Sequence, residues 1–380
     1  MYFGLSEEQQ SLENSIKRYL EDNASLDTIK AVAGGDKETA EKVHQGLIDL
    51  GISSLLVPEK YGGLELDMLF ASVVSGALGS GTAPVPFTGT YVMAPLALSL
   101  AGSEVQKDYW LPKIAGGERI IGIGLSEFVG AREDTAISFS NDTLSGRALF
   151  IIDGKNADAF ILSDKAGQLF IIDADDSGLT KIELTTVDKT RESMELVLKK
   201  VKTEILPGSE KNQDVINKVI DAGRLMLSAD SLGASQVMLD KAVAYSLERK
   251  QFGRQIGSFQ AVKHMCAEMA AELEPCHAMV WHTAHCFDHI PEEARLMACH
   301  TKAHVSEVGK QVSRTAIEVH GGMGFTEELG LHYWFKRIGL NRQLLGSPEL
   351  VREEAAKIQN FDQSPPESQR TKEAGNPLLV

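Results

Sequence analysis

The hydrophobic and polar positions divide the chain into three consecutive regions. In residues 1–114, apolar residues recur at a spacing of about 3.6, which is typical of amphipathic helices, as in residues 38–52 and 67–81. Ser6 precedes the polar start of the first such segment, and a serine in this position is a common helix N-cap. The pattern therefore predicts an N-terminal α-helical domain over residues 1–114.

The second region, residues 115–210, has a different pattern. Short runs rich in Ile, Leu, Phe and Val alternate with turn-forming pieces such as SNDTLSG and DADDSG. No helical segment lies between these runs to make the crossover that parallel strands usually need. We therefore predict a small antiparallel β domain, inserted between two helical layers.

The third region, residues 211–362, returns to helical periodicity and begins with a long segment at residues 214–250. It predicts a C-terminal helical domain, and the three regions together predict an α+β multi-domain fold. The last residues, 363–380, are polar and contain prolines. Such a tail cannot bury much apolar surface, so we expect it to be disordered.

Composition excludes several classes of protein. The 380 residues carry 53 acidic and 38 basic side chains, a net charge of −15, which argues against a nucleic-acid partner. The longest apolar stretch, residues 91–102, is interrupted by a proline and is too short to span a bilayer. The N-terminus lacks the basic and apolar parts of a signal peptide. These features predict a cytoplasmic protein.

Histidines and cysteines gather between residues 276 and 304. His285 with His289, and His300 with His304, have the i,i+4 spacing that could bind one metal ion from one helix face. No HExxH signature accompanies them, and cysteines without a CxxC pair are usually buried as small apolar side chains. We therefore predict neither a metal site nor a disulfide framework.

Two local motifs point to ligand binding. ERKQFGRQIGSFQ, residues 248–260, places two arginines and a glutamine at a junction of predicted helices, where they could bind a diphosphate. A helix corner with solvated arginines is the alternative. HGGMGF, starting at His320, contains glycines that would let the backbone approach a ligand closely. This loop follows a helix, so a Rossmann site is a poor fit and a simple connecting loop is the alternative.

Taken together, RKQFGRQIGSFQ and IEVHGGMGF resemble motifs of the acyl-CoA dehydrogenase family. FGLSEEQQ, LLVPEKYGGLELD and WLPKIAGGERIIGIGLSE resemble others, in the family's order, so the similarity spans about residues 3–360. It implies an N-terminal α-helical domain, a middle β domain and a C-terminal four-helix bundle. It also implies FAD as cofactor, oxidation of the Cα–Cβ bond of an acyl-CoA by way of a glutamate base, and an electron-transfer flavoprotein as acceptor.

The resemblance assigns one half of an FAD site to this chain. In the family, the two motifs hold the ADP half of a neighbouring subunit's FAD. The matching positions are Arg249, Gln251, Phe252, Ile256, Gln260, Glu318, Gly321, Gly322 and Gly324. Glu318 replaces a glutamine; it could accept a hydrogen bond from a ribose hydroxyl but would repel a diphosphate. Arg224 matches an arginine near the acyl chain, which implies contact with substrate; an ion pair inside the bundle is the alternative.

The flavin half of the site departs from the family. Only Ser126 and Glu127 remain of a Gly-rich run, which reads LSEFVGARED here. Phe150 and Ile152 replace a Trp-x-Thr pair that stacks on the flavin and bonds its N5 region. An isoleucine side chain cannot donate that hydrogen bond.

Both positions at which family members carry the catalytic glutamate are also changed. QLLGSPELVR puts Leu345 at one of them, and Gly223 stands at the other. Neither side chain can accept a proton, so the reaction should lose several powers of ten in rate. Glu349 and Asp221 are nearby carboxylates, but a move of four residues shifts a group about 6 Å along a helix.

These replacements predict the non-catalytic subunit of a hetero-oligomeric acyl-CoA dehydrogenase, of the kind that bacteria use for sterol side chains and other unusual thioesters. A homologous catalytic subunit would supply the base and the flavin pocket. Two alternatives stay open. One is a homotetrameric enzyme with a relocated carboxylate base, and the other is a catalytically dead acyl-CoA-binding protein.

Overall fold

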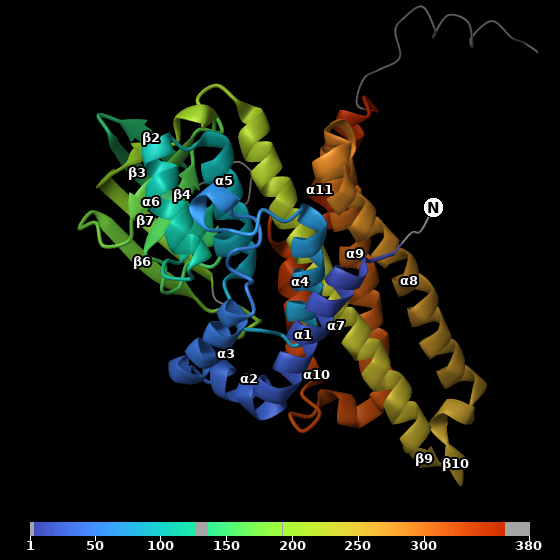
Figure 1. Ribbon diagram of the computed structural model, residues 1–380. Coiled ribbons are helices and arrows are strands. Elements are labelled where there is room, and N and C mark those ends of the chain that lie inside the picture. Colours follow the sequence, from blue (N-terminus) through green and yellow to red (C-terminus); the bar gives the residue numbers. More distant parts are fainter. Residues whose placement is uncertain (1–3, 126–135, 192, 362–380) are drawn as a thin grey trace, which may run out of the picture.

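A computed structural model describes residues 4–125, 136–191 and 193–361. The chain forms a β-rich lobe and a lobe of long helices, with the N-terminal helices beside both (Figure 1). Within the described ranges, none of the helices is long and apolar enough to cross a membrane. The tail predicted to be disordered, residues 363–380, lies outside the described residues.

The N-terminal region is helical, as its periodicity predicts. Ser6 caps the first helix: its hydroxyl accepts from the Gln9 N–H while the Gln9 side chain accepts from the Ser6 N–H, so the predicted N-cap is confirmed as a capping box. The elements are α1 (Glu7–Asn23), α2 (Leu26–Ala33), α3 (Lys37–Asp49), η1 (Glu59–Tyr61), α4 (Met68–Ser80), the π-helical η2 (Phe87–Met93), α5 (Ala94–Ala101) and α6 (Glu104–Ala115).

The middle region contains two four-stranded sheets packed face to face. Leu144, Phe160, Phe170 and Leu196 lie in the core that the strands enclose. The sheet orders are β1-β4-β5-β8 and β2-β3-β7-β6. The strands are β1 (Ile121–Gly124), β2 (Ile137–Ser140), β3 (Thr143–Ile151), β4 (Ala159–Ser163), β5 (Leu169–Asp173), β6 (Leu179–Leu184), β7 (Ser193–Lys202) and β8 (Glu204–Ile205).

One strand pair contradicts the prediction of a purely antiparallel domain. β1 and β4 are parallel, with Ile121 opposite Ala159 and Gly124 opposite Leu162. A parallel pair needs a long crossover. The described part of that crossover contains β2 and β3, which belong to the other sheet. The prediction was wrong because a crossover through a second sheet leaves no helical segment in the sequence.

The C-terminal region is built around the long helix α7, which packs against α4 of the N-terminal region and against α8, α9 and α10. The connection after α9 is the short helix η5 (Gly321–Phe325), and η3 (Pro207–Ser209) precedes α7. The remaining elements are α7 (Gln213–Glu248), β9 (Lys250–Gln251), β10 (Arg254–Gln255), η4 (Ile256–Ser258), α8 (Gln260–His289), α9 (Pro291–His320), α10 (Leu331–Gln343) and α11 (Pro348–Ile358).

A buried group of charges joins the three regions. Asp230 of α7 pairs with Arg191 of the middle region at 3.0 Å and with Arg337 of α10 at 3.1 Å. Arg337 also donates to the Ala83 carbonyl and to the Thr190 hydroxyl, at 2.9 and 3.0 Å. All three charged side chains are buried. Removing one partner would leave a buried charge uncompensated, so this group fixes how the domains meet.

Candidate functional site

The two positions that carry a glutamate in the resembled family lie against each other. A Cβ atom on Gly223 would lie 2.4 Å from Cδ1 of Leu345 and 2.7 Å from Sδ of Met93. Leu345 is buried in the turn between α10 and α11, with a φ of 57°. Two distant segments therefore meet at one point, and hydrocarbon and thioether groups fill it. No proton acceptor is present among these three side chains.

Arg224, the residue after Gly223, holds this arrangement in place. It is 2% exposed. Its Nε donates to the Leu345 carbonyl at 2.9 Å, and its Nη2 donates to Glu354 of α11 at 2.7 Å. Its Nη1 donates to Asp221 at 3.1 Å. All three guanidinium nitrogens of Arg224 thus bind groups of this chain, as expected for an ion pair inside the helical bundle. Contact of Arg224 with the substrate stays a prediction.

The two carboxylates considered as relocated bases are both paired. Asp221 also lies 3.6 Å from Arg295, and burial raises its pKa to about 7. Glu349 is exposed and accepts from Arg342 at 2.9 Å. Hydrogen bonding, first of all from Ser347, lowers the pKa of Glu349 to about 2. Neither carboxylate is a free base directed at the Leu345 position.

The residues at the predicted flavin half of the site offer apolar groups. Ile152 is 4% exposed, and its backbone N–H and carbonyl pair with those of Ile123 at 2.8 and 2.9 Å. Phe150, at an irregularity near the end of β3, has a φ of 54° and is half-exposed. Ser126 and Glu127 lie outside the described residues. Position 152, where the resembled family has a threonine that bonds the flavin, therefore provides no side-chain hydrogen-bond donor.

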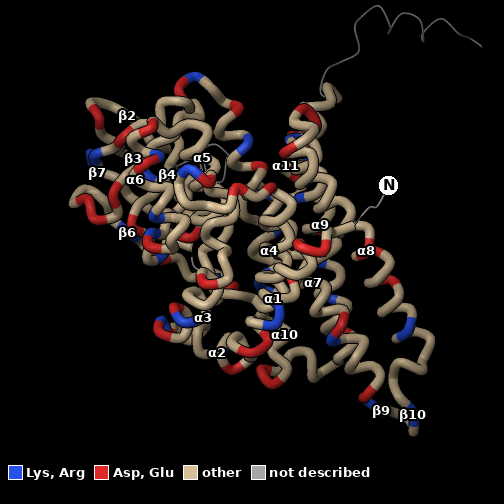
Figure 2. Tube along the Cα trace, viewed as in Figure 1, with Lys and Arg blue, Asp and Glu red and all other residues tan. Residues whose placement is uncertain are grey.

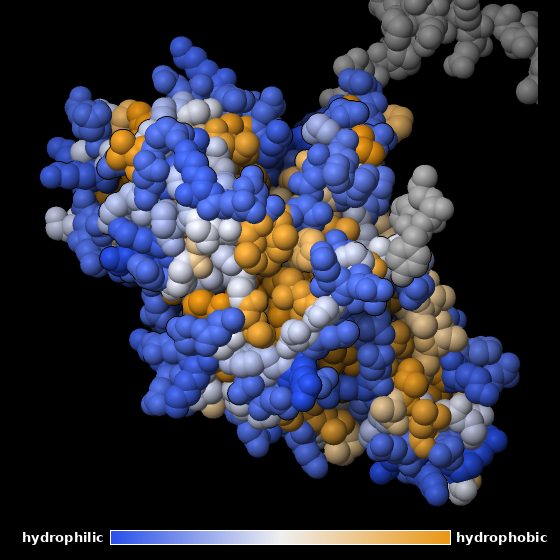
Figure 3. Space-filling model, in the orientation of Figure 1, coloured by the Kyte–Doolittle hydropathy of each residue, from blue (hydrophilic) through white to orange (hydrophobic). Residues whose placement is uncertain are grey.

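The first predicted ADP motif forms the tip of the α7–α8 hairpin. Arg249 ends α7, and its carbonyl accepts from the Ile256 N–H at 2.8 Å, which closes the β9–β10 turn. Phe252 is 92% exposed with a φ of 53°. Arg249, Gln251 and Gln260 are also exposed, so the side chains of this motif are accessible. Figure 2 shows the basic positions at this tip, and Figure 3 shows hydrophobic surface beside them.

The second predicted motif lies at the same end of the bundle. The ring of Tyr245, four residues before Arg249, stacks on His320 at a centroid distance of 4.5 Å. Gly321 follows with a φ of 59° and a ψ of −139°, which side chains disfavour. Cβ atoms on Gly321 or Gly322 would meet nothing within 4 Å, so backbone is open to a ligand there.

Two further residues of this motif have different surroundings. Glu318 is exposed on the last turn of α9, and its carbonyl accepts from the Gly321 N–H. A Cβ on Gly324 would lie 2.7 Å from the Ile317 carbonyl, so this glycine allows close packing of the loop on α9. The structure therefore brings both motifs together at one exposed end.

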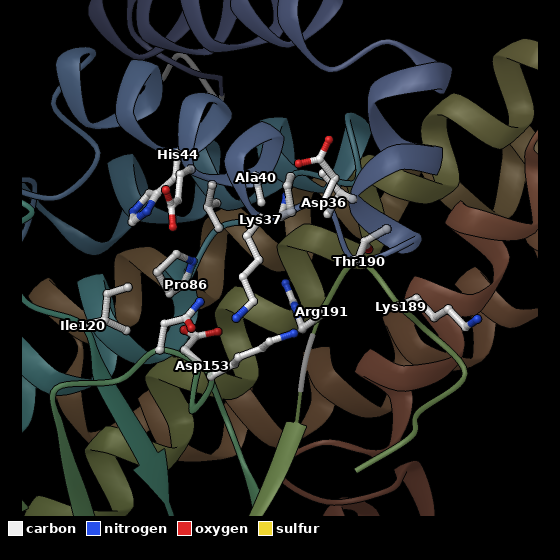
Figure 4. A pocket seen from close by; sticks show the side chains of 17 residues that line it. Asp36, Lys37, Ala40, His44, Pro86, Ile120, Asp153, Lys189, Thr190 and Arg191 are labelled. Atoms are coloured by element: carbon white, nitrogen blue, oxygen red, sulfur yellow. The ribbon is translucent and has the colours of Figure 1, made fainter. Parts of the chain in front are cut away.

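A cavity that the sequence did not indicate lies elsewhere, between α3 and the middle region (Figure 4). Its volume is about 180 Å³, and its walls include His44, Asp153 and Arg191. His44 lies 2.7 Å from the Tyr91 hydroxyl, and burial lowers the pKa of His44 to about 4. The lining comes from several separate segments, so no local motif could have marked it. None of the predicted site residues lines this cavity.

Comparison with known families and proteins agrees with the fold. Residues 6–118 match the acyl-CoA dehydrogenase N-terminal domain, and residues 213–359 match the acyl-CoA dehydrogenase C-terminal domain. The chain is 27% identical to acyl-CoA dehydrogenase IpdE2 of Mycolicibacterium smegmatis, over 90% of this chain and 96% of that protein. It is 26% identical to the probable acyl-CoA dehydrogenase YngJ of Bacillus subtilis, over 93% and 98% of the two chains.

Solved structures give the same result. A chain from a variant of the Tcur3481–Tcur3483 steroid ACAD superposes with a TM-score of 0.84 at 26% identity, covering 94% of this chain and 98% of that one. Butyryl-CoA dehydrogenase of Megasphaera elsdenii shares the fold, with a TM-score of 0.83 at 24% identity over 94% and 100% of the chains. The chain therefore belongs to the acyl-CoA dehydrogenase family, whose members use FAD, and has its helical, β and helical domains in that order.

Proposed function

We propose that this chain is the non-catalytic subunit of a hetero-oligomeric acyl-CoA dehydrogenase and holds the ADP half of its partner's FAD. The contact between Leu345 and the Gly223 position carries this proposal. Both places from which a glutamate could reach an α-proton are apolar and packed together. Because general base catalysis needs a proton acceptor within hydrogen-bond reach, the base must come from another polypeptide.

The two halves of the FAD site fit the cofactor unequally. Exposed Arg249 and Gln260 suit an adenosine diphosphate, since cationic and amide donors bind such groups, and the open space at Gly321 lets a ligand approach the backbone closely. Ile152, buried and without a side-chain donor, does not suit the flavin ring. When bound, FAD supplies the acceptor for the hydride. The residues of this chain would bind and orient its distal half and take no part in proton transfer.

The proposal extends to the class of substrate. A relative of known structure is a steroid ACAD whose name pairs two proteins, Tcur3481 and Tcur3483. We take a sterol-derived or similarly bulky acyl-CoA thioester as the substrate class of the complex, and an electron-transfer flavoprotein as its acceptor. The partner is a homologous subunit that keeps the glutamate, and the complex acts in the cytoplasm.

The same observations give less support to the two alternatives, a homotetrameric enzyme with a relocated base and an acyl-CoA-binding protein without activity. A relocated base would have to be Asp221, which is buried against two arginines, or Glu349, which is exposed and paired with Arg342. An acyl-CoA-binding protein without flavin would have no use for an exposed arginine–glutamine tip beside an open glycine loop. If a relocated base were correct, replacing Asp221 or Glu349 by alanine would abolish dehydrogenase activity. If the chain were an acyl-CoA-binding protein without flavin, the purified complex would contain no FAD.

The test is reconstitution with a homologous subunit that has an intact glutamate. We expect the chain alone to carry little FAD and to show no dehydrogenase activity, whereas the co-expressed pair should carry FAD and turn over. Arg249→Ala in this chain should lower the FAD content of the pair. Lys250→Ala, at the neighbouring exposed position, is the matched control and should leave it unchanged. Full FAD occupancy together with turnover of the isolated chain would rule out the proposal.

A further inference from the structure

A group of metal-ligating side chains lies where α8 turns into α9, at the opposite end of α8 from Gln260. His282 and Cys286 are one helical turn apart on α8, and Glu293 is in the first turn of α9. An imidazole nitrogen, the thiol sulfur and a carboxylate oxygen lie within 4.8 Å of one another. Cys286 is buried, His282 is half-buried and Glu293 is exposed, so an ion could enter from the Glu293 side.

The spacing of the first two ligands already matches a tetrahedral metal. Cys286 Sγ lies 3.6 Å from His282 Nε2. With Zn–S and Zn–N bonds of about 2.3 and 2.0–2.1 Å, the S–N edge of a tetrahedron is also about 3.6 Å. Ion binding would displace the thiol proton. The thiolate and the Glu293 carboxylate would then balance the charge of a divalent ion.

We propose that His282, Cys286 and Glu293 bind one divalent ion of the zinc class, with water as the fourth ligand. Nitrogen and sulfur donors together favour zinc and related transition metals over magnesium or calcium. The i,i+4 pairs considered from the sequence were His285 with His289 and His300 with His304, and no metal site was predicted. The sequence pattern missed this group because one ligand comes from the following helix.

A second group of potential metal ligands is unsuitable for binding a cation. Asp221, Cys299 and Glu354 also converge, but Arg224 and Arg295 pair with both carboxylates. The charge that would attract a cation is therefore already neutralised. Among the described residues, no lysine or arginine forms an ion pair with Glu293.

Cobalt(II) added to the full-length chain after chelator treatment tests the proposal. A thiolate ligand gives a charge-transfer band in the near ultraviolet, and tetrahedral geometry gives intense visible bands. We expect each chain to bind one cobalt ion and to show both the charge-transfer band and the visible bands. Zinc should displace the cobalt and remove these bands, because zinc binds such sites more tightly. Cys286→Ser should abolish the charge-transfer band and lower affinity at least about tenfold. Glu293→Gln should lower affinity about tenfold and keep the band.

Glu292→Gln is the matched control for Glu293→Gln, because Glu292 is also exposed in the first turn of α9 but is outside the group. Cys266→Ser is the control for the thiol. Both should retain the cobalt spectrum and the affinity. Absence of the charge-transfer band, or its persistence in Cys286→Ser, would overturn the proposal. If Cys286→Ser does not fold, His282→Ala must abolish the tetrahedral visible bands. The readout is independent of dehydrogenase activity and of the proposed subunit role.

Discussion

The two ends of α7 have opposite characters. Near its start, Gly223 and Arg224 are buried against Leu345, and every guanidinium nitrogen is engaged within the chain. At its end, Arg249 and Phe252 are exposed, and Gly321 leaves open space beside them. A side chain that is kept for packing is satisfied by its own chain. The side chains proposed to bind the partner's FAD are exposed, and Phe252 is exposed even with a disfavoured backbone φ of 53°.

This contrast predicts different responses to substitution at the two ends. In a buried position, losing a carboxylate allows apolar packing, which favours folding. In an exposed position, an arginine or aromatic residue adds little to folding, and the role proposed for such residues in this chain is binding. We call the part of α7 around Gly223 and Arg224 the closed end, and the tip with Arg249 and Phe252 the exposed end. New polar groups at the closed end are therefore expected to destabilise the fold. Substitutions at the exposed end are expected to weaken binding without lowering stability.

The largest effect should come from placing a glutamate at the closed end. Gly223→Glu would force Cβ into contact with Leu345 and Met93 and bury a new charge, so we expect a loss of at least about 3 kcal/mol in the free energy of unfolding. Gly339→Glu is the matched control, because Gly339 is exposed in α10 and a Cβ there meets nothing within 4 Å. Denaturant melts compare them. Equal stability would mean that the closed end has room for a base.

The pH dependence of stability tests the buried ion network. Burial raises the pKa of Asp221 to about 7, above its value in the unfolded chain. The folded chain therefore binds a proton more tightly, so the contribution of Asp221 to stability is fully present below about pH 4 and is lost as pH rises to about 7. Asp221→Asn should remove a decline on the order of 4 kcal/mol over this range. Parallel stability curves of the two proteins would contradict this assignment.

Helical periodicity and capping were enough to predict α1, its Ser6 N-cap and the helical character of both outer regions, since these depend on neighbouring residues. Long-range features were not predictable in this way. The parallel pairing of β1 with β4 depends on a crossover through another sheet. The long-range partners of Arg224 lie on α11 and in the turn before it, and Asp230 meets one arginine of the middle region and one of α10. Periodicity identifies which face of a helix is buried but not what it meets.

A smaller effect is expected at the glycine loop of the exposed end. Gly321→Ala would place a side chain at a φ of 59° and a ψ of −139°, at a cost of about 1–3 kcal/mol. Gly322→Ala, the matched neighbour, should change stability by less than about 0.5 kcal/mol. Both add a methyl group to the same open space. We therefore expect both to lower the FAD content of the reconstituted pair. A loss of FAD in Gly321→Ala alone would mean that backbone strain, and not contact with the ligand, is responsible.

The smallest change in stability is expected for Phe252→Asn. Phe252 has a φ of 53° and is 92% exposed, and its one ring contact among the described residues is with Phe259 at a centroid distance of 6.1 Å. Asparagine tolerates the left-handed region better than phenylalanine does, which offsets the lost ring contact. The free energy of unfolding should therefore stay within about 0.5 kcal/mol of the original. FAD binding by the reconstituted pair should nevertheless fall, because the exposed ring would be gone. If stability fell by several kcal/mol while FAD content was unchanged, Phe252 would serve the fold of the tip, and the contrast between the two ends of α7 would fail at its most exposed residue.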